Sequence, residues 1–545
     1  MDRHLKYAAP LVFLVFAATL LPWRCNFPLN DDWAYALASR ALAETGRLRL
    51  CDWGASTQLP HLLWGALFTK LFGFSFGALR VANLLVSAAG LYFFVRLMEE
   101  FDIAPGPKAA AALALALNPL YLVLADSFMT DQHYLLWMLA ACLFYVRRLK
   151  DPSDDRSLWL AGACSAMAYL TRQLGVALPL AFTLALFLER RPGRRELAAV
   201  WALPAAAMLG FALWFKYVNG PTWASENYVG AATLAHLSRF GAFLGDAVRR
   251  VLASAMETGL LLLPLAAAFL FSAGRFRRKN GFRVKVHAAV PWLALAALTV
   301  FALTGGPLPY LQNNISPSGL GALTLGGSVL KPSGLFASPT FWRLATVLSV
   351  AGAALLVCAS DLALRAGPHA LRFVFAAAML QLALSLVGAK YFDRYLLTLL
   401  PWFALAAAFA AKGVRFSLPA AGTALALYAA LGWAGMKDYM AWNTAKWELT
   451  ERPHPGLLSG EIAAGFDHDA WLNYEQDMAY LKSMKPLDAI GEWEWQSLIQ
   501  YKALVSFAPD QRLRLLDRIE YSTPLSAEKG VLYLMALPPA APPAR

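Results

Sequence analysis

The chain has 545 residues, of which 59% are hydrophobic and only 15% are charged, whereas soluble domains carry about 25% charged residues. This composition excludes an ordinary soluble enzyme and indicates a polytopic membrane protein. The net charge of +13 does not indicate a nucleic-acid-binding protein, because the basic residues gather in short clusters beside apolar runs. These clusters are RRLK at 147–150, RRPGRR at 190–195 and RFRRKNGFRVK at 275–285, and such clusters mark cytoplasmic loops.

Apolar runs of about 17 to 25 residues predict transmembrane helices. The first run is not followed by a small-residue cleavage site, so it is read as a retained span and not as a signal peptide. With the N-terminus inside, alternating spans place every basic cluster in the cytoplasm and the C-terminus outside. The thirteen predicted spans are 8–23, 77–97, 108–126, 132–149, 157–172, 174–189, 198–217, 251–272, 287–304, 341–362, 369–388, 394–411 and 418–436.

This topology leaves four longer segments on the outer side, at 24–76, 218–250, 305–340 and from about 437 onward. The cytoplasmic loops are too short for a nucleotide-binding domain, and the sequence contains neither a P-loop nor a dinucleotide fingerprint. Any chemistry is therefore expected at the outer face. We expect an integral protein of a bacterial inner membrane.

The first outer segment reads NFPLNDDWAYALASRALAETGRLRL at 26–50. Apolar residues recur with helical spacing after Asp32, and Gly46 is a stop signal, so Asp31 and Asp32 are predicted at the first turn of a short interfacial helix. One interpretation is structural, because acids at a helix N-terminus cap it and complement its dipole. The other interpretation is that the two acids are catalytic.

A second acidic site favours the catalytic interpretation. ADSFMTDQHYLLWMLA at 125–140 places Asp126 and Asp131 at the outer mouth between the third and fourth spans. Acids at the end of an apolar span are costly unless they face water or a partner. Two acidic sites on one surface fit a general base and a companion acid. A divalent metal ion held by Asp31 and Asp131 is an alternative role, because hard cations prefer oxygen ligands.

Candidate phosphate ligands lie near the end of the chain's membrane part. KYFDRYLLTLLP at 390–401 carries Lys390, Arg394 and Tyr395 at the outer end of the twelfth span, and Arg172 in YLTRQLG lies at an outer turn. Basic residues at such positions either snorkel to the membrane interface or bind an anionic ligand. His61 is a single histidine without the spacing of a zinc site.

The cysteines and the tail give two further expectations. Cys25 and Cys51 bracket the first outer loop, and in an oxidising space they either form a disulfide or remain two unlinked thiols. Residues 437–545 are more polar than the rest and contain VLYLMAL at 531–537, which is typical of a strand. We therefore expect a transmembrane module at 1–436 and a small outer α/β domain at 437–545.

The order of four segments resembles a known family. DDWAYALASRALAETG, LPHLLWGALFTKLFG, MTDQHYLLWMLAACLFY and YFDRYLLTLLP together are similar to the membrane-embedded GT-C glycosyltransferases, and most to the family 39 group of protein O-mannosyltransferases and lipid A aminoarabinose transferases. The resemblance covers the whole chain. It implies a polytopic α-helical membrane protein of GT-C type, with about 13 transmembrane helices, interfacial helices in the first outer loop and a small outer C-terminal α/β domain.

The resemblance also implies roles for individual residues. Asp31 would activate the acceptor, Asp32 stands where many members have Glu, and Asp131 matches the family's second acid. Arg394, with Tyr395, Lys390 and Arg172, would bind the donor phosphate. Lys70 lies where aminoarabinose transferases carry a KPP motif, but the motif is absent, which argues against that subgroup.

The sequence therefore predicts an inverting glycosyltransferase. It would move a sugar from a polyprenyl-phosphate donor to a glycan, lipid or protein acceptor at the outer face of the lipid bilayer. The alternative is a transporter or flippase of lipid-linked saccharides, which would more typically show internal repeats and charged, broken helices at the membrane midplane. An assembly protein is a third reading that would leave the paired outer acids unexplained.

Overall fold

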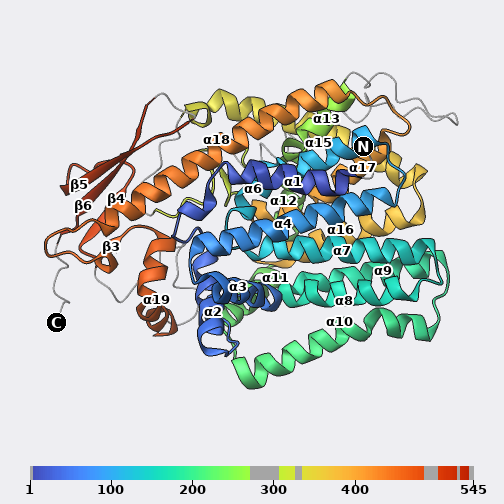
Figure 1. Ribbon diagram of the computed structural model, residues 1–545, viewed down its shortest axis with the longest axis horizontal. Coiled ribbons are helices and arrows are strands. Elements are labelled where there is room, and N and C mark those ends of the chain that lie inside the picture. Colours follow the sequence, from blue (N-terminus) through green and yellow to red (C-terminus); the bar gives the residue numbers. More distant parts are fainter. Residues whose placement is uncertain (1–3, 271–305, 326–333, 484–500, 525–527, 539–545) are drawn as a thin grey trace.

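The computed structural model describes residues 4–270, 306–325, 334–483, 501–524 and 528–538, and it is largely helical (Figure 1). The first half of the chain contains α1 (Leu5–Ala18), η2 (Pro22–Arg24), α2 (Asp32–Thr45), α3 (Leu59–Phe72), α4 (Phe76–Glu99), α5 (Pro105–Ala116), α6 (Pro119–Ala125), α7 (Thr130–Lys150), α8 (Asp155–Thr171), η3 (Gln173–Val176), α9 (Ala177–Glu189), α10 (Arg194–Trp214), η4 (Phe215–Asn219), η5 (Ala224–Ala231), α11 (Ala232–Ser238), α12 (Phe240–Leu261) and α13 (Leu263–Leu270). The second half contains β1 (Ile315–Ser316), β2 (Gly319–Leu320), η6 (Gly334–Ala337), α15 (Pro339–Ala366), α16 (His369–Val387), η7 (Asp393–Thr398), α17 (Leu400–Ala410), α18 (Leu418–Glu451), η8 (Ser459–Glu461), β3 (Ile462–Ala463), α19 (Phe466–Ser483), β4 (Ala503–Ser506), β5 (Arg514–Tyr521) and β6 (Gly530–Ala536).

Each predicted span that falls on described residues coincides with a helix or a pair of helices, and the span expected at 287–304 lies outside them. By length and composition, five helices of the described part are able to cross a membrane, or seven if each bent pair counts as one span. These helices agree with an integral membrane protein. The total of thirteen spans stays a prediction.

Two predicted spans are bent. The span bends by 53° between α5 and α6. The bend arises because Pro119 cannot continue the helix of α5 and disfavours helical backbone at Asn118. The Asn118 side chain instead caps α6 by accepting a hydrogen bond from the Leu120 amide at 3.0 Å. The second bend, between α12 and α13, is 74°.

One helix is longer than the span predicted within it. The span expected at 251–272 begins as a helix at Phe240, inside the segment expected to be an outer loop at 218–250. Asp246, Arg249 and Arg250 interrupt the apolar run there and therefore hide the helix from a hydropathy reading. In the helix these charges are neighbours, and both arginines form ion pairs with Asp246 at 2.6 Å.

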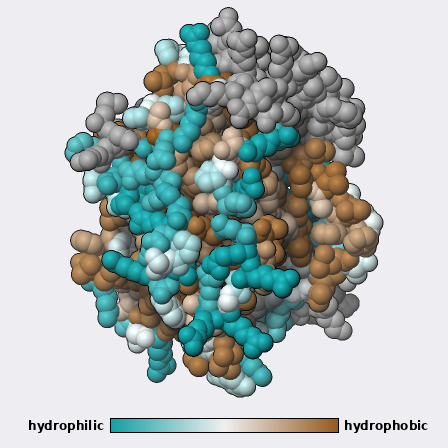
Figure 2. Space-filling view, turned by 90° about the vertical axis from the view of Figure 1, so that its right-hand side faces the viewer, coloured by the Kyte–Doolittle hydropathy of each residue, from teal (hydrophilic) through white to brown (hydrophobic). Residues whose placement is uncertain are grey.

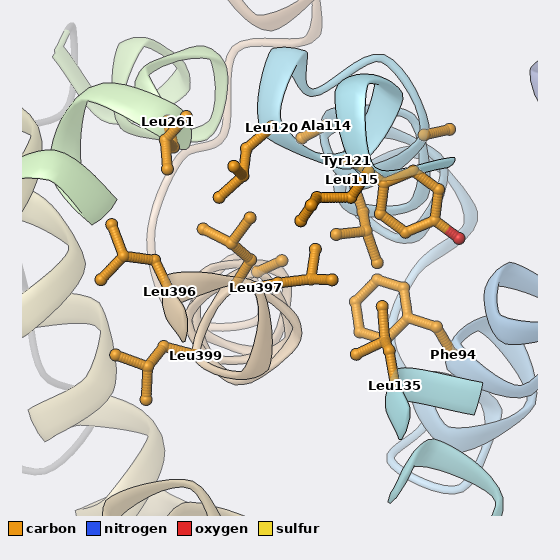
Figure 3. Packing of buried hydrophobic residues seen from close by; sticks show 14 of the residues in the cluster. Phe94, Ala114, Leu115, Leu120, Tyr121, Leu135, Leu261, Leu396, Leu397 and Leu399 are labelled. Atoms are coloured by element: carbon orange, nitrogen blue, oxygen red, sulfur yellow. The ribbon is translucent and has the colours of Figure 1, made fainter. Parts of the chain in front are cut away.

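The core surrounds the break between α5 and α6. Figure 3 shows side chains of α4, α5, α6, α7 and α12 meeting those of the 393–399 segment, among them Phe94, Leu115, Tyr121, Leu135 and Leu397. All five are at most 1% exposed. The segment that carries Arg394 is therefore anchored in the core by the leucines that follow it.

The C-terminal residues form a four-stranded sheet in the order β3-β4-β6-β5, in which β3 and β4 are parallel and the other neighbours antiparallel. β6 confirms the strand predicted at 531–537. The sheet lies at one end of the molecule beside α18 (Figure 1). α18 runs through the domain boundary expected at 437, so the helix is shared by both parts.

The opposite end of the molecule is rich in hydrophilic side chains (Figure 2). Residues of the RRLK cluster form ion pairs there: Arg147 and Lys150 with Glu100, and Arg148 with Glu196. The placement of this end in the cytoplasm stays a prediction.

Candidate active site

Asp31 lies directly before α2, but its side chain does not cap that helix. One carboxylate oxygen accepts a hydrogen bond from Trp53 Nε1 at 3.1 Å, and the other accepts one from Arg394 Nη1 at 3.2 Å. The side chain is 20% exposed. The structural interpretation of Asp31 as a helix cap is therefore wrong, and its carboxylate is open to a bound molecule.

Asp32 has a different role from the one expected. It is 0% exposed, and its carboxylate accepts hydrogen bonds from the backbone amides of Leu29 at 2.7 Å and Phe128 at 3.2 Å. Burial raises the pKa of Asp32 to about 7. The predicted catalytic role of Asp32 is therefore corrected: a side chain enclosed by backbone cannot reach a substrate, but it ties the Asp31 loop to the turn before α7.

That turn leads to Asp131, which is 2% exposed. Arg172 Nη2 donates to Asp131 Oδ2 at 2.7 Å, and Arg172 Nε donates to Thr130 Oγ1 at 2.9 Å. The Arg172 side chain is therefore held as the partner of an acid, and its role as a phosphate ligand stays a prediction.

Tyr35 shows that the two acidic sites converge. Burial, and next the charge of Asp31, raises the pKa of Tyr35 to about 12, so its phenol stays neutral at ordinary pH. The charges of Arg394, Arg172 and Asp131 also act on this phenol. Ring contacts link the two sites: the Tyr35 and His61 ring centres lie 5.3 Å apart, and those of His61 and His133, two residues after Asp131, lie 4.7 Å apart.

Asp31, Tyr35 and Arg394 line a cavity of about 440 Å³, called here the Asp31 cavity. Its wall combines amide and hydroxyl side chains with aromatic rings. The other lining residues are Asn30, Trp53, Ala55, Ala224, Gln312, Asn313, Ser316, Ala322, Leu323, Thr324, Leu325, Phe392 and Phe466. Polar groups beside apolar surface are typical of a small-molecule site.

The 308–316 segment, which supplies Gln312 and Asn313, is held by two buried carboxylates that the sequence reading missed. Asp393 accepts hydrogen bonds from the amides of Asn314 at 2.7 Å and Ile315 at 2.6 Å. Glu257 of α12 accepts hydrogen bonds from two further amides of the segment, both at 2.6 Å. Asp393 precedes Arg394, so the loop and the arginine share one anchor.

Arg394 is buried among aromatic rings and does not snorkel. Its side chain is 12% exposed, and the guanidinium carbon lies 5.2 Å from the Phe392 ring centre and 5.8 Å from that of Tyr395. Its Nε is buried and has no hydrogen-bond partner among the described residues. The interpretation of Arg394 as an interface anchor is therefore wrong. Of its five N–H donors, one contacts Asp31.

Lys390 does not join Arg394. It lines a separate cavity of about 740 Å³, called here the basic cavity. The cavity is also lined by His236, Arg239, Arg249 and Arg250 from α11, α12 and the turn between them. Tyr310 and Tyr391 line the basic cavity, whereas their near neighbours Gln312 and Phe392 line the Asp31 cavity. The two cavities are therefore adjacent. Lys70 is exposed on α3 and lines neither.

The described residues contain no group of three or more histidine, cysteine, aspartate or glutamate side chains placed to hold a metal ion. Asp31 and Asp131 already bind arginines. A divalent ion shared by Asp31, Asp131 and a donor phosphate stays a prediction. His61 and His133 are buried against each other, with ring centres 4.7 Å apart, as packed core residues.

The predicted disulfide between Cys25 and Cys51 is not formed. The Cys25 sulfur lies 3.9 Å from Thr444 Oγ1 of α18. Cys51 is buried in the cluster that contains Trp33, and burial raises the pKa of its thiol to about 11.

Comparison with known proteins identifies a class for part of the chain. Residues 60–219, less than a third of the chain, match the family model of dolichyl-phosphate-mannose-protein mannosyltransferases. The matched part contains Asp131 and Arg172, while Asp31 and Arg394 lie outside it. No curated protein matches the chain.

Three solved structures are similar over long stretches. ArnT from Cupriavidus metallidurans bound to undecaprenyl phosphate shares 12% identity, with 96% of this chain and 97% of that chain covered and a TM-score of 0.38. The archaeal oligosaccharyltransferase AglB from Archaeoglobus fulgidus shares 12% identity over 91% of this chain and 61% of that chain, with a TM-score of 0.43. The S. cerevisiae Pmt1-Pmt2 complex bound to the sugar donor shares 13% identity over 43% and 36%, with a TM-score of 0.32. Over residues 60–219 the family-model match agrees with the predicted resemblance to GT-C glycosyltransferases.

Proposed function

We propose that this protein is an inverting glycosyltransferase that moves a sugar from a polyprenyl-phosphate donor to an acceptor at the outer face of the membrane. The observation that carries the proposal is the Asp31 carboxylate, which does not cap α2 and lines a cavity with Arg394. A general base needs a carboxylate within hydrogen-bond reach of the acceptor, and the Asp31 cavity offers one.

The reaction requires one base and one group that stabilises a departing phosphate. An acceptor hydroxyl or amine attacks the anomeric carbon, and Asp31 takes its proton. The bond from the anomeric carbon to the phosphate oxygen breaks, and the polyprenyl phosphate leaves with that electron pair. A single displacement inverts the anomeric centre. Arg394 would donate to the departing phosphate through guanidinium N–H groups that do not contact Asp31.

The basic cavity supports a donor that carries a phosphate and a lipid chain. Its cations outnumber its one acid, Asp246, so it attracts anions. The adjoining helix α12 exposes Leu244 and Val248 by 54% and 49%, and apolar side chains of this kind suit a hydrocarbon chain. We place the lipid end of the donor here and its sugar in the Asp31 cavity. The acceptor is a glycan, a lipid or a protein.

A strain that lacks the gene tests the proposal. Mass spectrometry of its envelope glycans and glycolipids should show one product missing, and the wild-type gene should restore it. Asp31→Asn should not restore it, because an amide cannot take a proton, and a base contributes about 10² to 10⁴-fold. Asp52→Asn is the matched control, since Asp52 lies in the same loop, pairs with Lys482 and lines neither cavity.

Product formation at the wild-type level by Asp31→Asn would refute the base. A transporter or flippase predicts a different result: liposomes with the protein would move a lipid-linked sugar across the bilayer without consuming it. Consumption without movement supports the transferase.

A further inference from the structure

Trp53 holds the proposed base from the side opposite to Arg394. Its Nε1 donates to Asp31 Oδ1 at 3.1 Å, while Arg394 Nη1 donates to Oδ2 at 3.2 Å. Each carboxylate oxygen therefore has one fixed donor. An indole N–H only donates, so Trp53 is able to orient the carboxylate but cannot accept the proton that Asp31 takes.

The Trp53 ring packs against the 222–224 segment, which is hydrogen-bonded to the residues on either side of Trp53. It stacks on Trp223, with ring centres 5.7 Å apart and planes 10° apart. The neighbouring residues fasten the same two segments together: the Ala224 amide donates to the Asp52 carbonyl at 3.0 Å, and Thr222 Oγ1 donates to the Gly54 carbonyl at 2.8 Å.

The third contact comes from the C-terminal part of the chain. The Phe466 ring lies 5.7 Å from the Trp53 ring at 55°, and both rings line the Asp31 cavity. The Phe466 amide donates to the Thr324 carbonyl at 3.0 Å. The next residue, Asp467, accepts two hydrogen bonds from Lys446 Nζ at 2.7 Å each, and both side chains are fully buried.

We propose that Trp53 is a positioning residue for Asp31, and that the C-terminal segment acts on the reaction by holding Trp53 through Phe466. The inference rests on the proposed function. With Trp53 in place the carboxylate cannot rotate away from the acceptor, and the proton passes to a carboxylate of fixed orientation. The sequence reading missed both residues, because their contact joins segments more than 400 positions apart.

Trp53→Phe tests this role, because it keeps an aromatic ring on Trp223 and removes the N–H donor. The assay measures undecaprenyl phosphate released from a panel of synthetic undecaprenyl-phosphate monosaccharides by the full chain in lipid nanodiscs, with an envelope extract as acceptor. We expect kcat to fall about tenfold or more, while KM for the donor stays within about twofold. Trp201→Phe is the control: it removes an indole hydrogen bond to Thr183 Oγ1 away from both cavities and should leave kcat unchanged.

Wild-type kcat in Trp53→Phe, or a loss through KM alone, would overturn the proposal. A wild-type protein that releases no undecaprenyl phosphate would contradict the proposed function instead, so the two failures are distinguishable.

Phe466→Leu tests the second claim, that the C-terminal segment holds Trp53 through Phe466. It should lower kcat by a few-fold, since a smaller side chain holds the indole less firmly. Because Phe466 acts through Trp53, the double variant should be no slower than Trp53→Phe alone. If the double variant showed the product of the two single kcat losses, Phe466 would not act through Trp53. Thermal melting of all variants confirms that the compared proteins are folded.

Discussion

Around the Asp31 cavity, carboxylates are buried and accept hydrogen bonds from backbone amides, as Asp32 and Asp393 do. At the opposite, hydrophilic end, Glu100 pairs instead with Arg147 and Lys150, whose side chains are 30% and 47% exposed. Both regions hold many charges, but Asp32 and Asp393 are enclosed, whereas the basic partners of Glu100 reach water.

The difference separates two uses of charge. A buried carboxylate that accepts two amides fixes those amides in space, and losing it leaves them unsatisfied, at about 1 to 3 kcal/mol each. An exposed pair contributes about 0 to 1 kcal/mol and fixes little. The enclosed charges therefore shape the proposed active site, while the exposed ones lie at the end that the basic clusters predict to be cytoplasmic.

Lys446→Met should show the largest effect on stability. The substitution leaves Asp467 as an unpaired buried charge, which costs about 3 to 5 kcal/mol. Thermal or denaturant unfolding in detergent measures the loss. The double variant Lys446→Met with Asp467→Leu should recover most of it, since removing both charges of a buried pair is often nearly neutral. A single variant as stable as wild type would contradict the burial of this pair.

Arg394 substitutions should come next, and they act on the reaction. Arg394→Ala should lower the rate about ten- to hundredfold, because a hydrogen bond to a charged partner is worth about 1.5 to 3 kcal/mol. Arg394→Lys should also be impaired, since an ammonium cannot contact Asp31 and a phosphate with the separate donors of a guanidinium. The measurement is steady-state transfer from a synthetic polyprenyl-phosphate sugar.

Lys390→Ala is the comparison for Arg394, because Lys390 lines the basic cavity and not the Asp31 cavity. It should raise KM for the donor and change kcat less than Arg394→Ala does. Unchanged kinetics in Arg394→Ala would remove this arginine from the proposed reaction.

The sequence predicted the parts of the site that short motifs carry. The helical pattern after Asp31, the acid at the head of α7 and the arginine after Asp393 come together around Tyr35. Their surroundings could not be predicted, because they depend on contacts between distant segments. Asp32 and Asp31 are equivalent in sequence, and only the position of Phe128 shows which one is enclosed. Lys390 and Arg394 are four residues apart, but the chain between them separates two cavities.

Ionisation of Asp32 should have a smaller effect, which appears as a pH dependence of the protein's stability. Its folded-state pKa is raised to about 7 from 3.8, so the folded protein binds a proton that the unfolded chain has lost between these values. Stability from this group is therefore greatest at low pH and is lost as the pH rises toward about 7. Asp32→Asn cannot ionise, so its stability relative to wild type should rise by about 2 kcal/mol between about pH 5 and about pH 7. Parallel melting curves of both proteins at each pH measure the difference, and a constant difference would refute the raised pKa.

The smallest effect is expected at the hydrophilic end. Glu100→Gln removes the partner of Arg147 and Lys150, whose side chains reach water, so each can be hydrated in place of the lost carboxylate. We expect a loss of at most about 1 kcal/mol, which added salt should reduce further by screening. Transfer activity should stay at the wild-type level, because Glu100 lines neither cavity. Thermal melting at low and high salt measures the stability loss, and the transfer assay measures the activity. A loss as large as that of Lys446→Met would show that this end also depends on enclosed charge, and the contrast between the two regions would then be wrong.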